Sequence, residues 1–416
     1  MHPNAIDKIE KKIKGSLLNC HIKDNWPQYD SFSKHVDSLG KDVLKYKKEW
    51  LDINDIFSIF FDFVYESISN KVEKDQKVEG GLWDFLGEED GNKLVSTLKD
   101  FLISIPREYD LFISLPKISQ HLPGSIEFSK SISLAIFKEA DQVPGGVVRN
   151  AFLDNFDTRL ELNKVYIKQR LFGYCSNRLE NSCNKKAIQN FKIIIQQGTF
   201  KNLFKNYPEN AAASGLFGVF SHHQVPRVHI LSLDKARDPI KLVKTELPMD
   251  LCKWLNSVSF NWDADMFASA IRDGKTEQLI LSMLKKPVEL IECGLEESVR
   301  VVSAIQWCFN SYTLENETLA FLQVCIGLEA LLGDDGYNGA LTEILADRCS
   351  YLISNDIKGR KSIKKTFKEL YDVRSKLVHG NATELDTNQK WYLNWGRTIL
   401  EYAIMKEIKH LNLGKT

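Results

Sequence analysis

Apolar residues in the first part of the chain recur at helical spacing. Residues 1 to about 75 show this pattern, most clearly in the amphipathic stretch Lys41–Trp50 and the apolar stretch Ile53–Ile68. Residues 76 to 92 break it with Gly80-Gly81 and an acidic turn, which predicts a loop. The chain therefore begins with a helical region that ends in a loop.

The hydrophobic period changes further along the chain. Tyr109–Leu115 and Ile126–Phe137 alternate apolar and polar residues and are rich in branched and aromatic side chains, which predicts strands. Pro226–Leu233 and Pro239–Leu247 predict two more short strands. The middle of the chain also has two stretches with helical spacing, Phe152–Leu171 and Lys185–Gln197. Strands and helices are therefore mixed in this region.

From about Pro287 onward the pattern becomes uniformly helical. Gly333, Gly359 and Gly380 fall between or beyond the helical runs, where helix C-termini favour a left-handed residue. The sequence thus predicts an α+β protein with two parts. Residues 1–285 form a mixed module, with a break near 76–108, and residues 286–416 form an all-α bundle. The expected bundle helices are Val288–Tyr312, Asn316–Leu332, Leu341–Ile353, Ile363–Val378 and Trp391–Leu411.

The charge of the whole chain is balanced, with 55 Lys+Arg against 55 Asp+Glu in 416 residues. This balance argues against a protein that coats nucleic acid through a global basic field, although it leaves room for a local basic patch. Aromatic residues make up 11% of the chain, which favours a folded protein over a disordered one.

The eight cysteines form no CxxC pair, and several lie in apolar helical patterns. They indicate reduced, buried thiols in a cytoplasmic protein. The N-terminus lacks the features of a signal peptide, and the apolar run Ile53–Val64 is too short and too charged to span a bilayer. We therefore expect a cytoplasmic protein that does not enter the membrane.

The strongest sequence signatures of cofactors and metals are missing. The chain contains no GxxxxGK[ST], HExxH, GxSxG or paired CxxC motif. His222-His223, with Cys175 and Cys183 upstream, fits no known metal-binding spacing, so ordinary loop or core roles are expected for them. The sequence predicts neither a metal nor a cofactor.

One compact polar segment stands out near the C-terminus, from Tyr371 to Gly380 (YDVRSKLVHG). Arg374 and His379 are five positions apart, which places them roughly 140° apart around a helix, where they flank one broad face. A permanently charged arginine can fork onto a phosphate, and a histidine can move a proton near neutral pH. The two residues supply what RNA cleavage without a metal needs, namely proton transfer and stabilisation of charge at phosphorus. The pair alone also fits a structural role, with an arginine ion pair and a histidine at a helix end.

The surroundings of this pair resemble the HEPN superfamily, specifically its Apea-like branch. In that branch a helix similar to Gly327–Leu332 (GLEALL) is followed by a helix with an arginine, then by an R-x4-6-H motif, then by a closing helix. This chain has Glu329, Arg348, and Arg374 with His379 in that order, followed by Trp391–Leu411. The resemblance covers about 125 residues.

The resemblance implies a metal-independent endoribonuclease that acts as a homodimer and leaves a 2′,3′-cyclic phosphate and a 5′-hydroxyl. It implies catalytic roles for Arg374 and His379. The polar position after the arginine is Ser375, a weaker group than the Asn, Asp or His common there. Glu329 fits two roles, support of the active site or a structural partner for an arginine, of which Arg348 is the candidate.

Six basic residues lie in the eleven positions from 358 to 368, with no acidic residue among them. Such a run fits a solvated helix face, and next to the Arg374 motif it also fits contacts with an RNA backbone, which would give affinity without base choice. The expected RNA contacts are Lys358, Arg360, Lys361, Lys364, Lys365, Lys368 and Arg348.

The hypothesis is therefore a HEPN ribonuclease that cuts cellular RNA, with tRNA as one candidate, joined to an N-terminal module that senses or regulates. The resemblance further suggests an anti-phage abortive-infection effector with a phage-derived trigger. Two alternatives stay open. The bundle is a non-catalytic module that dimerises and binds nucleic acid or a nucleotide, or the N-terminal module is the enzyme and the bundle only assembles it.

Overall fold

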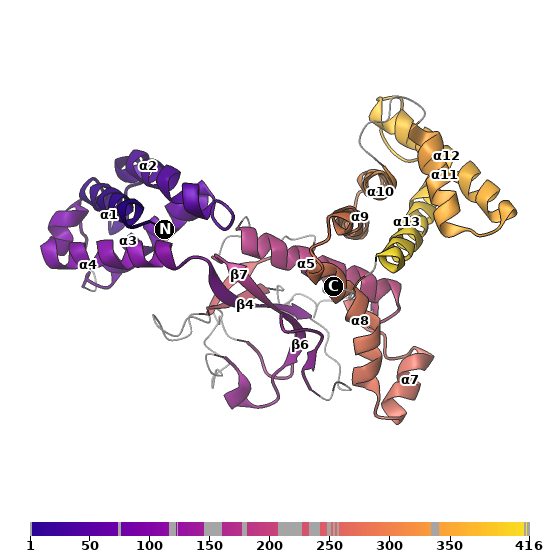
Figure 1. Ribbon diagram of the computed structural model, residues 1–416, viewed down its shortest axis with the longest axis horizontal. Helices are drawn as coiled ribbons and strands as arrows, with labels where there is room; N and C mark the ends of the chain where they lie inside the picture. Colours follow the sequence, from indigo (N-terminus) through magenta and orange to yellow (C-terminus); the bar gives the residue numbers. More distant parts are fainter. Residues whose placement is uncertain are drawn as a thin grey trace, which may run out of the picture. The chain divides into compact units, whose positions relative to one another are not determined.

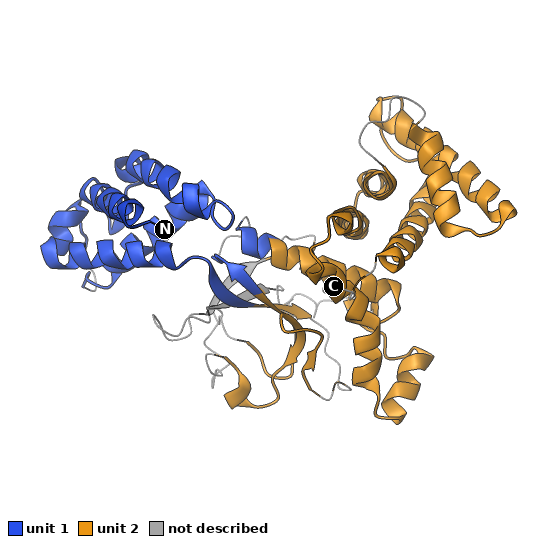
Figure 2. Ribbon diagram, in the orientation of Figure 1, with its two compact units in different colours: residues 1–110, 171–185, 231–241 blue, residues 111–170, 186–230, 242–416 orange. Residues whose placement is uncertain are grey.

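The computed structural model has an α+β fold, as the sequence predicts (Figure 1). Contacts between residues divide the chain into two units (Figure 2). Unit 1 comprises residues 1–110, 171–185 and 231–241, and unit 2 comprises the rest. The structure describes residues 2–73, 76–115, 122, 124–144, 160–176, 181–206, 227–232, 242–247, 251–252, 254–255, 258–333, 341–411 and 413.

Unit 1 is built mainly from four helices and a small sheet. The sheet has the strand order β2-β1-β3, and β1 pairs antiparallel with both neighbours. The helices bury one apolar face each in a common core that includes Ile13, Phe32 and Phe60. The elements are α1 (Pro3–Leu18), β1 (His21–Lys23), β2 (Trp26–Pro27), α2 (Tyr29–Lys47), α3 (Ile53–Ser69), β3 (Gly80–Gly81) and α4 (Leu82–Ser104).

The predicted loop at 76–92 is wrong in its second half, because α4 begins at Leu82. Leu82, Leu86 and Leu94 are buried, so this stretch has an apolar helical face that the glycines and acidic residues hide in the sequence. Gly87 has φ 80° and marks a kink between two helical segments. A residue without Cβ accepts that backbone conformation without strain.

A six-stranded sheet has the order β10-β9-β4-β7-β6-β5. The predicted strand at 109–115 is confirmed, and the predicted strand at 126–137 is in fact two antiparallel strands, β5 and β6. The strands are β4 (Arg107–Leu115), β5 (Ile126–Glu127), β6 (Ile132–Ile136), β7 (Val165–Gly173), β9 (Arg227–Ser232) and β10 (Leu242–Glu246).

The helix predicted over Phe152–Leu171 is wrong for its C-terminal part, which is strand β7. Val165, Tyr166 and Ile167 are buried in succession, and β7 pairs antiparallel with β6 through five residue pairs. Where a strand is buried on both faces, as at the start of β7, apolar and polar residues do not alternate, and the sequence pattern does not distinguish the strand from a helix. Residues 151–159 lie outside the described part of the chain.

The other elements of unit 2 before the bundle are mainly helical. Helix α5 confirms the helix predicted at Lys185–Gln197, and β8 pairs antiparallel with β11. The elements are η1 (Ala140–Gln142), α5 (Ser182–Phe200), β8 (Phe204–Asn206), β11 (Val258–Phe260), α7 (Asp265–Arg272) and α8 (Thr276–Glu292). Helix α8 runs through residue 285, where the sequence predicts the domain boundary, and has Pro287 inside it. The division by residue contacts assigns both sides of residue 285 to unit 2.

The last part of the chain is helical, and its helices closely follow the predicted ones. The first predicted helix is divided, because α8 ends at Glu292 and α9 starts after Gly294, which has φ 58°. None of the described helices is both long enough and apolar enough to span a membrane. The bundle helices are α9 (Glu296–Thr313), α10 (Glu317–Leu332), α11 (Leu341–Ile353), α12 (Ile357–Val378) and α13 (Lys390–His410).

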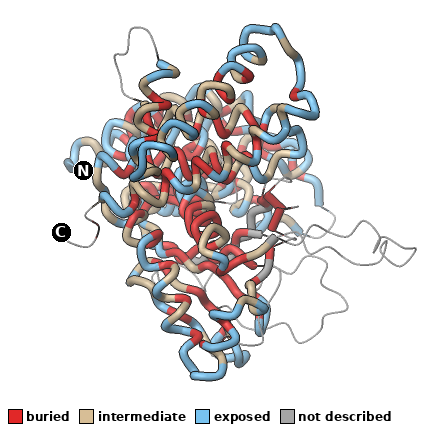
Figure 3. Tube along the Cα trace, turned by 90° about the vertical axis from the view of Figure 1, so that its right-hand side faces the viewer, coloured by how far each residue is buried: buried red, intermediate tan, exposed pale blue. Residues whose placement is uncertain are grey.

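The bundle core depends on close approach between α10 and α13. A Cβ added to Gly327 of α10 would lie 2.7 Å from Leu400, and one added to Gly396 of α13 would lie 2.9 Å from Val324. Each glycine thus makes room for a side chain of the facing helix. Figure 3 shows the buried residues gathered along the inner sides of the helices and along the strands.

Helix α5 joins the bundle through a polar network around Glu401 of α13. Glu401 Oε1 accepts hydrogen bonds from Gln196 Nε2 of α5 at 2.8 Å and from the Tyr312 hydroxyl of α9 at 3.0 Å. The Arg397 guanidinium lies over the Tyr312 ring, 4.5 Å from its centroid. Burial raises the pKa of Glu401 to about 7, and the two hydrogen bonds and Arg397 only partly offset it.

Candidate functional site

The predicted site lies at the C-terminal end of α12. His379 is the C-cap residue, and Gly380 follows with φ 74°, which confirms the predicted left-handed residue after the helix. The amide of Asn381 donates to the carbonyl oxygen of Lys376 at 2.8 Å. The helix end is therefore closed by backbone hydrogen bonds, which fixes where the His379 side chain leaves the chain.

Arg374 and Glu329 form an ion pair between α12 and α10. The distance from Arg374 Nη2 to Glu329 Oε1 is 3.2 Å, and the side chains are 30% and 27% exposed. The structure thus brings together two of the four predicted catalytic residues. The expected pairing of Glu329 with Arg348 is wrong, because the arginine that pairs with Glu329 is Arg374 of α12. Arg348 Nη1 instead donates to the Leu332 carbonyl oxygen at 2.7 Å.

Tyr371 belongs to the same cluster, although the sequence pattern assigned it no role. It lies one turn before Arg374 on α12, and its buried hydroxyl donates to the Cys325 carbonyl oxygen of α10 at 3.4 Å. Burial, with the nearby Cys325 and Glu329, raises the pKa of Tyr371 well above its usual value. Tyr371 is therefore a neutral donor that helps hold α12 against α10. In the sequence, its spacing of three residues from Arg374 is the signal that places Tyr371 on the same side of the helix.

His379 and Ser375 are both exposed on α12. Within the described part of the chain, neither side chain makes a hydrogen bond or an ion pair. This differs from Arg374, whose charge is held by Glu329. The site thus combines a guanidinium that is paired with a carboxylate and an imidazole that is exposed to solvent.

The six basic residues of the 358–368 run all lie on α12, but their charges are not equally available. Lys364 pairs with Asp347 of α11 at 2.7 Å and with Glu343 at 3.3 Å, and Lys368 also pairs with Glu343. These ion pairs link the exposed sides of α11 and α12. The two lysines lower the pKa of Glu343, Lys368 most strongly.

Arg360 and Lys365 are also engaged. The Arg360 guanidinium lies 4.2 Å from the centroid of the Tyr351 ring, and its Nε donates to the Ser354 carbonyl oxygen at 2.9 Å. Lys365 lies 3.9 Å from Glu369, one turn away on α12. Among the described residues, no ion pair involves Lys358 or Lys361, and both are exposed. The basic run therefore presents mainly two lysines at its N-terminal end.

These two lysines lie far from the Arg374 site. Lys361 precedes Arg374 by thirteen residues, which is about 20 Å along the axis at about 1.5 Å per residue. A phosphate held by Arg374 is therefore not the one that Lys361 contacts. The structure separates the predicted catalytic residues from the predicted RNA contacts.

The arrangement places a permanent positive charge and an exposed imidazole near one helix end. The guanidinium of Arg374 is permanently charged and lies 3.2 Å from Glu329 Oε1, although this buried oxygen accepts no hydrogen bond from the described residues. Within the described ranges, no three His, Cys, Asp or Glu side chains come close enough to hold a metal ion together. His222 and His223 lie outside these ranges.

Comparison with known proteins assigns neither a family nor a function to the chain. No protein-family model, no curated protein and no solved structure matches the chain. The functional conclusion therefore depends on the residues at the end of α12 and on the motif that they form.

Proposed function

We propose that the chain is a metal-independent endoribonuclease of the HEPN type, with Arg374 and His379 as its catalytic residues. In the proposed reaction the RNA 2′-hydroxyl loses its proton and attacks the adjacent phosphorus. The bond from phosphorus to the 5′-oxygen breaks, and this oxygen takes up a proton. The products are a 2′,3′-cyclic phosphate and a 5′-hydroxyl. His379 serves proton transfer, and Arg374 binds the charge on the phosphate oxygens.

One observation carries the proposal, namely an arginine that forms an ion pair with Glu329 and an exposed histidine near the same helix end. Glu329 holds Arg374 at 3.2 Å, while His379 is exposed at the C-cap of the same helix. Ser375 is exposed between them and provides a further polar group beside the scissile phosphate. An ion pair that restrains the guanidinium favours catalysis, because a charged group already oriented toward the phosphate need not be ordered during the reaction.

The wider role follows from the resemblance. The bundle would form a homodimer that brings two Arg374/His379 pairs to one cleft, and the enzyme would act on cellular RNA, with tRNA as one candidate, in the cytoplasm. The N-terminal part would sense a phage-derived trigger and release the activity in an abortive-infection response. This role rests on analogy with the family.

A second candidate function has one observation in its favour. Arg374 is engaged in a half-buried ion pair with Glu329, which also fits a brace between α10 and α12. The bundle would then be a non-catalytic module that dimerises and binds nucleic acid or a nucleotide. It would bind RNA and leave it intact, and Arg374→Ala would weaken binding only.

Inducible expression in a bacterial host separates these functions. The wild-type chain would be compared with Arg374→Ala and His379→Ala, and with His35→Ala as a control for the loss of an exposed histidine on another helix. The proposal expects growth arrest and new 5′-hydroxyl RNA ends with the wild type and the control, but with neither site variant. Arrest and new RNA ends of equal strength in all four strains would refute it.

A further inference from the structure

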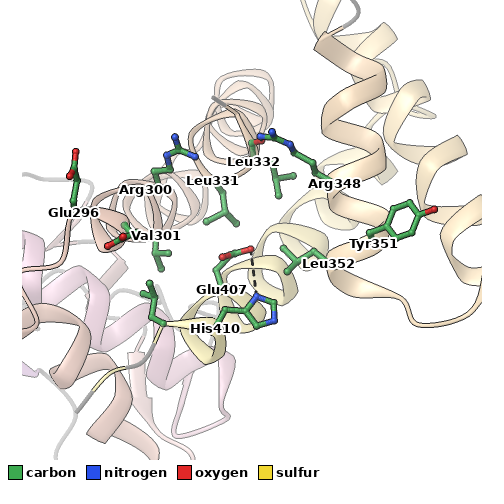
Figure 4. A pocket seen from close by; sticks show the side chains of 12 residues that line it. Glu296, Arg300, Val301, Leu331, Leu332, Arg348, Tyr351, Leu352, Glu407 and His410 are labelled. Atoms are coloured by element: carbon green, nitrogen blue, oxygen red, sulfur yellow. Dashed lines mark hydrogen bonds and ion pairs between the residues drawn. The ribbon is translucent and has the colours of Figure 1, made fainter. Parts of the chain in front are cut away.

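Charged side chains gather in a pocket of the bundle as well as at the Arg374 site. This pocket lies between α9, α10, α11 and α13, and it is lined by Arg300 and Arg348 and also by Glu296 and Glu407 (Figure 4). Since both signs of charge are present, its lining gives no preference for an anion over a cation. A cluster in unit 1 differs from it, because positive charges there outnumber negative ones.

Three lysines in unit 1 share one carboxylate where α1 packs against α2 (Figure 1). Asp42 Oδ1 accepts hydrogen bonds from Lys8 Nζ at 3.1 Å and from Lys45 Nζ at 2.8 Å. Lys12 Nζ lies 2.5 Å from the other carboxylate oxygen. The three ammonium groups, Lys12 most strongly, hold the pKa of the buried Asp42 carboxyl far below its usual value. The cluster therefore carries three positive charges and one negative charge.

Lys8 and Lys45 present the accessible charge of this cluster. Their side chains are 57% and 63% exposed. Lys12 also donates to the carbonyl and hydroxyl oxygens of Ser38, at 2.7 and 2.9 Å. Because Lys8 and Lys45 donate to the same oxygen, their ammonium groups are neighbours. An ammonium group has three N–H donors, and in the described part of the chain neither lysine donates to a residue other than Asp42. The two lysines can therefore donate to a further anion.

Three acidic residues close to the cluster in sequence face other lysines. Asp37 pairs with Lys41, one turn along α2, at 2.7 Å, and Glu10 pairs with Lys99 of α4 at 2.8 Å. Glu10 most strongly, and Asp7 more weakly, raise the pKa of Lys99, so Asp7 also lies near that lysine. These carboxylates therefore leave the excess charge of the cluster in place.

Two further lysines extend the positive surface. Lys11 lies one turn from Lys8 on α1, and Lys48 lies one turn from Lys45 at the end of α2. Both are exposed, and neither forms an ion pair with a residue that the structure describes. Glu49 is the exposed carboxylate next to Lys48, and it offsets only one of these charges. Positive charge thus stays in excess on the exposed surface of α1 and α2.

An exposed aromatic ring lies next to this charge. Tyr46 follows Lys45 on α2, is 48% exposed and stacks on no other ring among the described residues. Asp42, and to a smaller extent Tyr46, raise the pKa of Lys45, so the Tyr46 hydroxyl lies close to that lysine. Lysines attract the phosphates of a nucleic-acid strand, and exposed rings stack on its bases. The combination is therefore typical of surfaces that bind single-stranded nucleic acid.

We propose that this surface of unit 1 binds single-stranded nucleic acid, with a phosphate between Lys8 and Lys45 and a base stacked on Tyr46. Phosphate oxygens and base faces are common to RNA and DNA and to all sequences, so these contacts give affinity without choice of sequence. The proposal goes beyond the ribonuclease function and does not rest on it, because these residues lie in unit 1 and none of them belongs to the Arg374 site.

Fluorescence anisotropy of a labelled oligo(dT) strand of twelve nucleotides, titrated with the full chain, tests the proposal. DNA lacks the 2′-hydroxyl that the proposed cleavage needs, so the strand stays intact whether or not the chain is a ribonuclease. We expect binding that weakens about sevenfold between 50 and 200 mM salt, as two phosphate contacts on a single strand give. A glutamate peptide of twelve residues, which matches the charge but has no bases, should compete poorly.

Variants locate the binding. Lys8→Gln with Lys45→Gln should weaken binding about tenfold and keep the fold, since both side chains are exposed. The matched double variant Lys130→Gln, Lys138→Gln removes the same charge from exposed positions in unit 2 and should keep the affinity within about twofold.

The aromatic contact is tested separately. Tyr46→Ala should weaken binding about fivefold through the loss of stacking, and Tyr46→Phe, which keeps the ring, should bind as the wild type does. The proposal is overturned if the oligo(dT) strand does not bind, if the Lys8 and Lys45 double variant keeps the wild-type dissociation constant, or if the glutamate peptide binds as tightly as the strand. The last result would indicate an acidic protein partner instead.

Discussion

The two ends of helix α12 hold their charges in different ways. At the C-terminal end, Arg374 forms an ion pair with one carboxylate, and His379 is exposed without a partner among the described residues. In the N-terminal half, Lys364 and Lys368 are neutralised by Glu343 and Asp347 of α11. The C-terminal end thus presents an arginine and an exposed histidine, whereas lysines in the N-terminal half form ion pairs with the neighbouring helix.

The difference teaches that a basic run in a sequence is not a basic surface. The 358–368 run has no acidic residue, yet two of its lysines have carboxylate partners on α11, the helix that precedes α12. Exposed ion pairs of this kind contribute little stability, about 0–1 kcal/mol each, but they remove charge from the surface. RNA contacts should therefore be sought at Lys358 and Lys361 first.

The largest expected effect is on catalysis at the C-terminal end. We expect His379→Ala to slow RNA cleavage by about 100-fold or more, because a positioned proton-transfer group contributes at least that much. Cleavage of a labelled RNA by purified protein measures it, with His35→Ala as the control. Equal rates for wild type and His379→Ala would remove the chemical distinction between the two ends of α12.

Glu401 provides a third case, a carboxylate held mainly by neutral donors. Its pKa is raised to about 7, so the fold favours its protonated form, and its contribution to stability is lost as pH rises through about 7. We expect the melting temperature to fall between pH 5.5 and pH 8 by about 2–4 °C more in the wild type than in Glu401→Gln. Glu384→Gln, at an exposed site, should behave as the wild type. An identical pH profile for Glu401→Gln and wild type would contradict this account.

The Arg374–Glu329 pair should show a measurable but modest coupling. A double-mutant cycle of Arg374→Met and Glu329→Gln should give about 0.5–1 kcal/mol in the free energy of unfolding, since both side chains are about a third exposed. Urea unfolding measures the four proteins. A coupling near zero would mean that Glu329 does not fix the guanidinium, and the contrast with the N-terminal half would weaken.

The smallest expected effect concerns RNA affinity at the N-terminal end. We expect the double variant Lys358→Gln, Lys361→Gln to weaken RNA binding roughly threefold at moderate salt and to flatten its salt dependence. The matched double variant Lys364→Gln, Lys368→Gln should change RNA binding less, because those lysines already have carboxylate partners. The reverse order of effects would show that the ion pairs with Glu343 open when RNA binds.

The sequence predicted most of the bundle because long amphipathic helices carry a clear period. Leu341–Ile353 was predicted to the residue, and Gly380 was placed at its left-handed position. The start of α12 was missed by six residues, because Gly359 looked like a helix end. Instead its amide binds the side chain of Asp356, the N-cap residue of α12.

The parts that failed depend on contacts between distant segments. Strand β7 has three successive buried apolar residues at its start and three polar residues after them, so it does not alternate, and its pairing with β6 identifies it as a strand. The partners of Glu329 and of the lysines were likewise beyond sequence reasoning, because local spacing does not say which helix lies opposite. The Arg374–His379 motif itself was visible, since both residues lie on one helix.

The most direct test of the central claim is RNA cleavage by the purified wild-type chain in excess EDTA, with the new RNA ends mapped chemically. The account predicts cleavage that persists without metal and leaves a 2′,3′-cyclic phosphate and a 5′-hydroxyl. Cleavage that stops in EDTA, or that leaves a 5′-phosphate, would contradict the assignment of the chemistry to Arg374 and His379.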